Sequence, residues 1–492
     1  MISKVLNENI QAFEDMFTDC EDYIKRKFPV GRDQSVWVYM AYIDMMTDRM
    51  AVELTVLAPL LRFGSKHRLR PEYENIFGLL RDCGLDTADF NETTDFDLLI
   101  YFILAGETIL FIDGYDTAIV IASRGFPNRG VSSAETEVVV HGSQEAFNEV
   151  MRFNTALVRR RIRDPNLKVK QSRIGRRSET DIALMYLKDL ARPAVLKEVE
   201  KRLKSIDVDS ILDSGYVEQY IEDSWKSFFP QVQMTERPDK AAASILEGRI
   251  VIIVDNSPFV LIVPVTLNSF FQASEDYYDR WQIASFVRVI RYIAAFFSVA
   301  LPGFYLAAAV YHPSMIPMLL TLRMAQARQP VPFPAVIEIL FMDIAFELLR
   351  EAGIRLPRAA GGALGIVGGL IIGQAAVEAG LVSPIVVIVV ALSGVSNFAI
   401  PHVSLVAGFR LTKYLVIFLS AAFGLLGFWA GLLIILIHLA SLKSFGIPYL
   451  FPYTSAEINN YSDTKDSLFR MPLFTQKNRP FYANPENKKR QK

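Results

Sequence analysis

Four long apolar stretches in the second half of the chain limit most strongly what it can fold into. They cover residues 292–311, 361–380, 384–400 and 414–440. A helix needs roughly 20 mostly apolar residues to cross a bilayer, and backbone groups that meet no water in the hydrocarbon must be satisfied within helices. We therefore predict an all-α, multi-pass membrane domain over 281–441.

A fifth segment, 335–349, is equally apolar but carries Glu338, Asp343 and Glu347. Carboxylates inside a bilayer are costly and usually face a cavity or a partner. At about 100° per residue, Asp343 and Glu347 share a face, whereas Glu338 lies across the helix from Glu347. We favour an amphipathic helix that lies in the interface or packs inside the protein. A fifth span with intramembrane acidic residues is the alternative.

Basic residues flank the membrane domain and bear on its orientation, because lysine and arginine prefer the cytoplasmic side. Four spans would keep both the head and the tail in the cytoplasm, whereas five would put the tail outside. The N-terminus lacks the apolar core of a signal sequence, so we expect a cytoplasmic head. The flanking residues are Arg280, Arg288 and Arg291 before the first span and Lys488, Lys489, Arg490 and Lys492 in the polar tail, 442–492.

The stretch 361–380 combines two opposed faces. Small residues along one face permit close helix packing. The other face lies about 180–240° away on a helical wheel, where an amide and a carboxylate would be costly against lipid. Around a symmetry axis it would line a pore, with an apolar constriction and a cation-favouring vestibule; the alternative is a buried helix whose Gln374 bonds to another span. The hypothesised packing residues are Gly361, Gly365, Gly369 and Gly373, and the hypothesised pore-lining residues are Val367, Ile371, Gln374 and Glu378.

The head contains a possible internal repeat, because residues 103–122 align with residues 245–264 at an offset of 142. In each unit an aspartate followed by Gly or Asn interrupts apolar, β-branched runs, which predicts a β-hairpin. Two hairpins in equivalent positions indicate two related α/β subdomains. Gly106 and Asp113 match Gly248 and Asp255, and the expected segments are a helical lead-in over 1–29 and subdomains over 30–170 and 171–280.

Between the hairpins, residues 145–163 have helical apolar spacing and end in Arg159, Arg160 and Arg161. Cations suit the negative end of a helix dipole. A solvated, charged helix end is the favoured interpretation. Contact with anionic lipid or with another subunit is the alternative.

Several function classes find no support in the sequence. The net charge of −1 gives no argument for nucleic-acid binding. There is no Walker loop, dinucleotide fingerprint, HExxH or GxSxG, and the five histidines are scattered. The two cysteines fit a reduced head. We therefore expect no enzyme activity, no catalytic residues, and no cofactor or metal site.

Ordered stretches along most of the chain resemble the GerA family, the A subunits of spore germinant receptors. They include His141-Gly142, the run 276–291 (DYYDRWQIASFVRVIR), 311–317 (YHPSMIP), 346–357 (FELLREAGIRLP) and 365–378 (GIVGGLIIGQAAVE).

The resemblance implies a receptor in the inner membrane of the dormant spore. It implies partners, namely a transporter-like B subunit and a lipoprotein C subunit. It also implies a homo-oligomer that forms a nutrient-gated cation channel. A transporter component and a signalling scaffold without conduction are the alternatives.

Overall fold

The computed structural model describes residues 1–67, 69, 75–126, 137, 139–355, 369, 371–454 and 462–491. The chain forms two compact units. Unit 1 comprises Met1–Glu222, Val232–Pro264 and Lys477–Lys492, and unit 2 comprises Asp223–Gln231 and Val265–Gln476.

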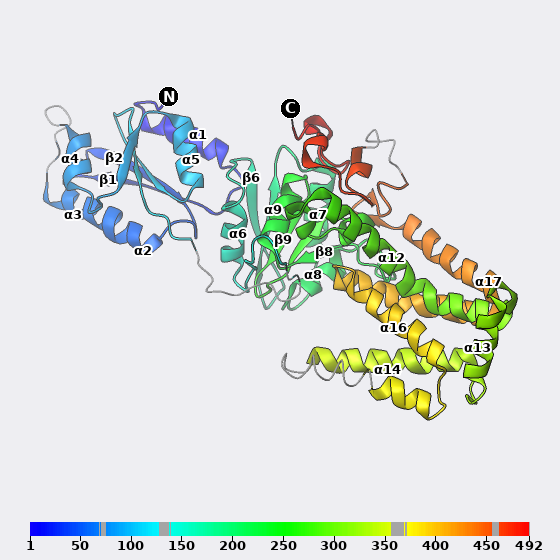
Figure 1. The fold of residues 1–492 in the computed structure, drawn as a ribbon. Helices are drawn as coiled ribbons and strands as arrows, with labels where there is room; N and C mark the ends of the chain where they lie inside the picture. Colours follow the sequence, from blue (N-terminus) through cyan, green and yellow to red (C-terminus); the bar gives the residue numbers. More distant parts are fainter. Residues whose placement is uncertain are drawn as a thin grey trace. The chain divides into compact units, whose positions relative to one another are not determined.

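Unit 1 contains two five-stranded sheets in which every paired strand is antiparallel (Figure 1). The strand order is β1-β2-β4-β5-β3 in the first sheet and β6-β7-β9-β10-β8 in the second, so equivalent strands occupy equivalent positions. The first sheet is built from β1 (Tyr23–Val30), β2 (Val36–Ile43), β3 (Phe90–Thr93), β4 (Thr108–Ile112) and β5 (Ala118–Ile121). The second is built from β6 (Leu167–Ile174), β7 (Thr180–Leu187), β8 (Gln233–Thr235), β9 (Ile250–Val254) and β10 (Val260–Val263).

Helices bury the apolar faces of both sheets. In the first subdomain, one core joins the sheet to α1 (Leu6–Met16) and α5 (Phe96–Leu104). The opposite core joins it to α2 (Arg49–Val52), the π-helical turn Glu53–Leu57, α3 (Ala58–Lys66) and α4 (Ile76–Cys83). In the second subdomain, α6 (Met151–Arg159) and α9 (Pro238–Leu246) share a core with β6, β7, β9 and β10. The remaining helices of this subdomain are α7 (Pro193–Lys204) and α8 (Ser214–Ile221).

The two aspartates of the repeat have the same structural role. Asp113 Oδ1 accepts a hydrogen bond from the backbone N–H of Leu6, at 3.2 Å, where α1 begins. Asp255 Oδ1 accepts one from the N–H of Met151, at 2.9 Å, where α6 begins. A carboxylate at a helix N-terminus satisfies a free N–H and the helix dipole. Each hairpin turn therefore caps the helix that packs on its sheet.

The predicted fold class, an α/β head of two related subdomains followed by a helical domain, is confirmed. The boundaries differ in two places. β1 begins at Tyr23, inside the expected lead-in. The sequence did not indicate this strand, because a run of exposed charged residues interrupts its alternation of apolar and polar positions. β6 begins at Leu167 and α6 packs on the second sheet, so the second subdomain starts earlier than residue 171.

Unit 2 is helical. Its elements are α10 (Leu267–Phe271), α11 (Glu275–Tyr278), α12 (Trp281–Leu306), which continues as a π-helical turn over Ala307–Tyr311, and a 3-10 turn over Pro313–Met315. They continue with α13 (Met318–Arg328), α14 (Ala335–Arg355), α16 (Pro384–Phe398), α17 (Val403–Ser441), β11 (Lys443–Ser444), β12 (Ile447–Pro448) and short 3-10 turns in 462–465 and 473–475. A further helix covers 371–378. Another 3-10 turn, Pro485–Asn487, lies in unit 1.

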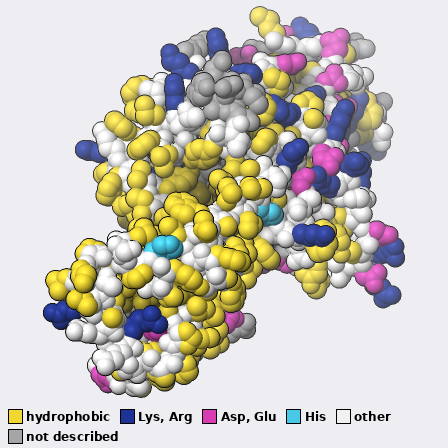
Figure 2. All heavy atoms as spheres, turned by 90° about the vertical axis from the view of Figure 1, so that its right-hand side faces the viewer, with side chains coloured by type: hydrophobic (Ala, Val, Ile, Leu, Met, Phe, Trp, Pro, Cys, Tyr) yellow, Lys and Arg dark blue, Asp and Glu magenta, His cyan; other side chains and the backbone are white. Residues whose placement is uncertain are grey.

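Within the described residues, two helical stretches are long and apolar enough to cross a bilayer by length and composition, Trp281–Tyr311 and Val403–Ser441, and the second of these is interrupted at Gly424. α16 is apolar but shorter. Figure 2 shows hydrophobic side chains over much of the visible face. Exposed apolar side chains of unit 2 include Phe286, Ile290 and Phe296 of α12 and Phe418, Leu426, Trp429 and Leu433 of α17.

α17 reverses its direction at Gly424, whose φ of 61° and ψ of −133° are not helical. A Cβ on Gly431 would lie only 3.2 Å from the Cα of Val416. A straight helix would separate residues at that spacing by about 22 Å along its axis. The two halves of α17 therefore pack side by side, and the predicted span 414–440 is not one continuous helix.

Candidate functional site

The helix over 371–378 carries the described part of the two-faced pattern. Gly373 and Ala376 are buried. A Cβ on Gly373 would lie 3.5 Å from Val387 Cγ1 of α16, and Ala376 shares a core with Val386 and Val390. The small side of this helix thus packs on α16.

The other side of the same helix is not covered by the described residues of this chain. Ile371 is 59% exposed, and Gln374 and Glu378 are exposed as well. Gln374 Nε2 donates a hydrogen bond to Glu378 Oε1 at 2.9 Å. The amide and carboxylate therefore bind each other and remain open to water or to another subunit.

The rest of the predicted pattern is less complete. Gly369 is exposed, and no described atom lies within 4 Å of where its Cβ would be. It lies about one turn further than Gly373 from the bend that leads to α16, so no described part of this chain packs against it. Gly361, Gly365 and Val367 lie outside the described residues.

Glu338, Asp343 and Glu347 of α14 each have a cationic partner. The Glu338 side chain is fully buried and accepts hydrogen bonds from Arg328 Nε of α13, at 3.2 Å, and from the N–H of Ser383, at 2.9 Å. Asp343 Oδ1 accepts one from Lys413 Nζ of α17 at 2.5 Å. Both side chains of this second pair are at most 3% exposed.

Glu347 is paired with two arginines. Arg410 Nε of α17 donates to Glu347 Oε1 at 2.9 Å, and Arg350 of α14 also contacts this carboxylate. Buried charges persist when they are paired and hydrogen-bonded. The structure therefore pairs all three carboxylates of this segment with cations of unit 2. The sequence did not point to Lys413, because it is 70 positions from its partner.

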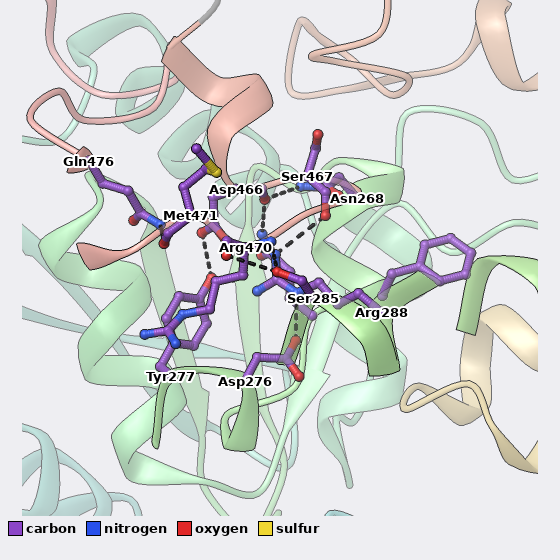
Figure 3. A network of polar contacts seen from close by, with 12 residues as sticks. Asn268, Asp276, Tyr277, Ser285, Arg288, Asp466, Ser467, Arg470, Met471 and Gln476 are labelled. Atoms are coloured by element: carbon purple, nitrogen blue, oxygen red, sulfur yellow. Dashed lines mark hydrogen bonds and ion pairs between the residues drawn. The ribbon is translucent and has the colours of Figure 1, made fainter. Parts of the chain in front are cut away.

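A second ionic network joins the start of α12 to the segment that follows α17 (Figure 3). Asp276 accepts hydrogen bonds from Arg288 Nε at 2.7 Å and from Arg291 Nη1 at 2.8 Å. Arg288 Nη1 also donates to Asp466 Oδ1 at 2.7 Å. The side chains of Arg288 and Asp276 are 0% and 2% exposed, so this charge pair is completely buried.

Further groups complete the network. Tyr277 donates its hydroxyl to Asp466 Oδ2 at 2.6 Å, and the guanidinium groups of Arg288 and Arg470 lie 5.6 and 5.5 Å from the centre of its ring. Ser285 Oγ donates to the Arg470 carbonyl at 2.9 Å. Polar side chains within residues 272–291 and 466–470 thus form one cluster (Figure 3).

This network changes the meaning of two predicted features. Arg288 and Arg291 were expected as basic flanks of the first span. They are instead neutralised by carboxylates inside unit 2, so their positions do not by themselves indicate orientation. No local pattern predicts a pairing with Asp466, which is 178 residues from Arg288.

The arginine cluster of the head is also not a solvated helix end. Arg159 is fully buried and binds Asp22, and its Nη2 donates to Asp22 Oδ1 at 2.9 Å. Arg160 and Arg161 both contact Glu145. Burial opposes ionisation of Glu145, but the hydrogen bonds from the two arginines outweigh it and lower its pKa. The favoured prediction was wrong because Asp22, which is distant in sequence, neutralises Arg159, and Glu145, at the start of the same stretch, neutralises Arg160 and Arg161.

Within the described ranges, no group of three or more His, Cys, Asp and Glu residues could hold a metal ion. Cys20 and Cys83 are both free.

Sequence and structure comparisons identify several relatives. A family described as "Bacillus/Clostridium GerA spore germination protein" matches residues 11–482. Spore germination protein KA of Bacillus subtilis (strain 168) is 39% identical over 494 residues, covering 100% of this chain and 89% of the relative. Spore germination protein GerLA of Bacillus cereus is 41% identical over 408 residues, covering 83% and 82%. The crystal structure of the N-terminal domain of the A subunit of the Bacillus megaterium spore germinant receptor GerK3 is 33% identical, covers 54% of this chain and 96% of that chain, and has a TM-score of 0.43.

Proposed function

Because the chain belongs to the GerA family of spore germination proteins, we propose that it is the A subunit of a nutrient-responsive germinant receptor whose copies form a cation channel. The channel would lie in the inner membrane of the dormant spore with the head in the cytoplasm. A transporter-like B subunit and a lipoprotein C subunit would be its partners. Release of cations through the channel would begin germination.

The observation that carries the channel proposal is the uncovered polar side of the helix over 371–378. Gln374 and Glu378 are exposed, whereas Gly373 and Ala376 pack on α16. An amide and a carboxylate in an apolar helical unit are costly against lipid. Water in a shared pore would satisfy both groups, and a ring of carboxylates would favour cations.

The ion pairs of α14 support the same assignment. Glu338, Asp343 and Glu347 are each neutralised by a cation of this chain. These ion pairs join α14 to α13 and α17. Glu378 differs from these three carboxylates, because its described contact is with the neutral amide of Gln374 and not with a cation.

Opening would be a population shift between two arrangements of the pore helices. A nutrient bound to a partner subunit shifts this equilibrium only by its differential affinity for the two arrangements. Small residues such as Gly373 let neighbouring helices slide at low packing cost. Ile371, exposed about one turn before Gln374 and about two turns before Glu378, would narrow the closed path.

The test is ion selectivity in liposomes that contain the purified receptor. Glu378→Gln is expected to reduce the preference for potassium over chloride, and Glu378→Lys to reverse it. Glu351→Gln, which changes an exposed carboxylate of α14, is the matched control and should leave selectivity unchanged. In spores, Ile371→Ala is expected to cause potassium release without nutrient.

The outcomes separate the alternatives. The assigned pore face would be refuted if nutrient still triggered ion flux and no Glu378 substitution changed the ion selectivity of that flux. Complete absence of flux from a folded receptor would favour a signalling scaffold. Stoichiometric accumulation of a nutrient in the liposomes would favour a transporter component.

A further inference from the structure

The two subdomains of unit 1 differ in the segment that pairs with the chain just after β2 in the first sheet and just after β7 in the second. In the first subdomain, the chain that follows β5 lies along the segment that follows β2. The N–H of Gly125 donates to the Met46 carbonyl at 3.0 Å, and the N–H of Asp48 donates to the Ser123 carbonyl at 2.7 Å. Thr47 and Arg124 form an antiparallel bridge between these bonds. In the first subdomain, the chain that continues from β5 therefore supplies this pairing segment.

The second subdomain cannot do the same, because its chain passes into unit 2 after β10 and Pro264. The C-terminal tail occupies the equivalent place. The N–H of Asn484 donates to the Leu190 carbonyl at 2.7 Å, and Ala191 and Ala483 form the antiparallel bridge.

The correspondence extends to the glycines of the repeat. Gly106 and Gly248 both have positive φ, 93° and 90°. A Cβ on Gly106 would lie 2.6 Å from the Met46 carbonyl oxygen, and a Cβ on Gly248 would lie 2.7 Å from the Leu190 carbonyl oxygen. The latter Cβ would also lie 2.9 Å from the Cα of Ala483. Gly248 thus leaves space for the tail residue Ala483, at the position that Gly106 occupies in the first subdomain.

Side chains anchor the tail at this edge. Tyr482 is 5% exposed; its hydroxyl accepts a hydrogen bond from Arg249 Nη2 at 2.7 Å and donates one to Glu247 Oε2 at 2.9 Å. Arg249 also lies 4.7 Å from the centre of the Tyr482 ring. Arg192 Nη2 donates to the Phe481 carbonyl at 2.8 Å, and its guanidinium lies 4.5 Å from the Phe481 ring.

We propose that the second subdomain carries a peptide-binding site for residues 481–484 of the C-terminal tail, which replace the segment that residues 123–126 supply in the first subdomain. Backbone pairing with residues 190–191, just after β7, gives such a site its affinity, and the contacts of Phe481 with Arg192 and of Tyr482 with Arg249 give it specificity. The site ties both ends of Val265–Gln476 to one subdomain. Any rearrangement of the helical unit must then either keep both attachments or release the tail.

Cysteine pairs in the full-length protein test the site. Residues that face each other between two ladder hydrogen bonds have Cα atoms about 4.5 Å apart, within disulfide range. With Cys83→Ser removing the exposed thiol, Ala191→Cys/Ala483→Cys is expected to form an intramolecular disulfide under mild oxidation. Thr47→Cys/Arg124→Cys is the matched positive control, and Thr47→Cys/Ala483→Cys, which combines the wrong subdomain with the tail, should not form one.

Failure of the 191/483 pair while the 47/124 pair forms would overturn the proposal, and so would a disulfide that joins two copies. Trypsin gives an independent measurement. Tyr482→Ala should speed cleavage after Lys477, the exposed site just before the anchored segment, by about tenfold or more, because truncation of a buried aromatic releases the segment that it anchors. Phe474→Ala, at a 73% exposed position, is the control and should not change the rate. A Tyr482→Ala rate within about twofold of wild type would also overturn the proposal.

Discussion

Asp276→Asn is expected to destabilise unit 2 strongly, because Asp276 is the carboxylate on which two buried arginines converge. It accepts hydrogen bonds from Arg288 and Arg291 at 2.7 to 2.9 Å and from the N–H of Ala273 at 3.2 Å. Asparagine preserves the volume and one acceptor but removes the charge. Arg291 would then have no anionic partner among the described residues, and its remaining acceptors would be the neutral asparagine oxygen and the Phe271 carbonyl, at 3.1 Å.

The expected magnitude follows from burial. Removing one partner of a buried ion pair costs about 3–5 kcal/mol, because the other charge is left uncompensated. For a unit of this size, each kcal/mol shifts the melting temperature by about 2–4 °C. We therefore expect Asp276→Asn to lower the melting temperature by about 6–20 °C.

An exposed pair provides the matched control. Arg176 and Asp207 are also an arginine–aspartate pair, but their side chains are 65% and 67% exposed. Water screens such pairs, so they contribute little to stability. Asp207→Asn should therefore leave the stability of unit 1 almost unchanged.

The assay is thermal unfolding of the detergent-purified protein, followed by tryptophan fluorescence. Trp225, Trp281 and Trp429 lie in unit 2 and only Trp37 lies in unit 1, so the signal reports mainly on unit 2. Circular dichroism in the far ultraviolet follows the sheets of unit 1 for the control. An Asp276→Asn melting temperature within about 2 °C of wild type would refute the reasoning from burial.

Three further outcomes follow from the geometry. Burial, with the like charges of Glu222 and Asp213, raises the pKa of Glu218 from 4.5 to about 7. The folded state then binds this proton more tightly than the unfolded state, so the free energy of unfolding falls as the pH rises from 4.5 to 7. In urea unfolding at pH 8, Glu218→Gln should be more stable than wild type by roughly 1–3 kcal/mol. At pH 4 the two proteins should be equally stable. Gly424→Ala would place a Cβ 2.8 Å from the Tyr311 ring at positive φ, so it should lower the melting temperature, whereas Gly353→Ala, with no described atom near its Cβ, should not. Asp343→Asn should cost about 3–5 kcal/mol, and an added Lys413→Met should recover much of that loss; simple additivity of the two losses would contradict a direct pair.

The sequence alone determined the features that depend on neighbours along the chain. Apolar runs predicted helices over 292–311 and 384–400, and turn residues between β-branched runs predicted the hairpins β4–β5 and β9–β10. The opposition of Gly373 to Gln374 and Glu378 also follows from helical period. These patterns are readable because local backbone geometry repeats every 2 or about 3.6 residues.

Only the tertiary structure decided which distant groups meet. Asp343 pairs with Lys413, Arg288 with Asp466, and Arg159 with Asp22. The predicted span 414–440 could not show that its chain reverses at Gly424, since glycine is also tolerated inside membrane helices. The polar tail likewise gave no sign that Tyr482 is buried against the second subdomain. Such contacts depend on three-dimensional proximity, which local periodicity does not encode, because charge neutralisation and edge pairing act between whichever segments the fold brings together.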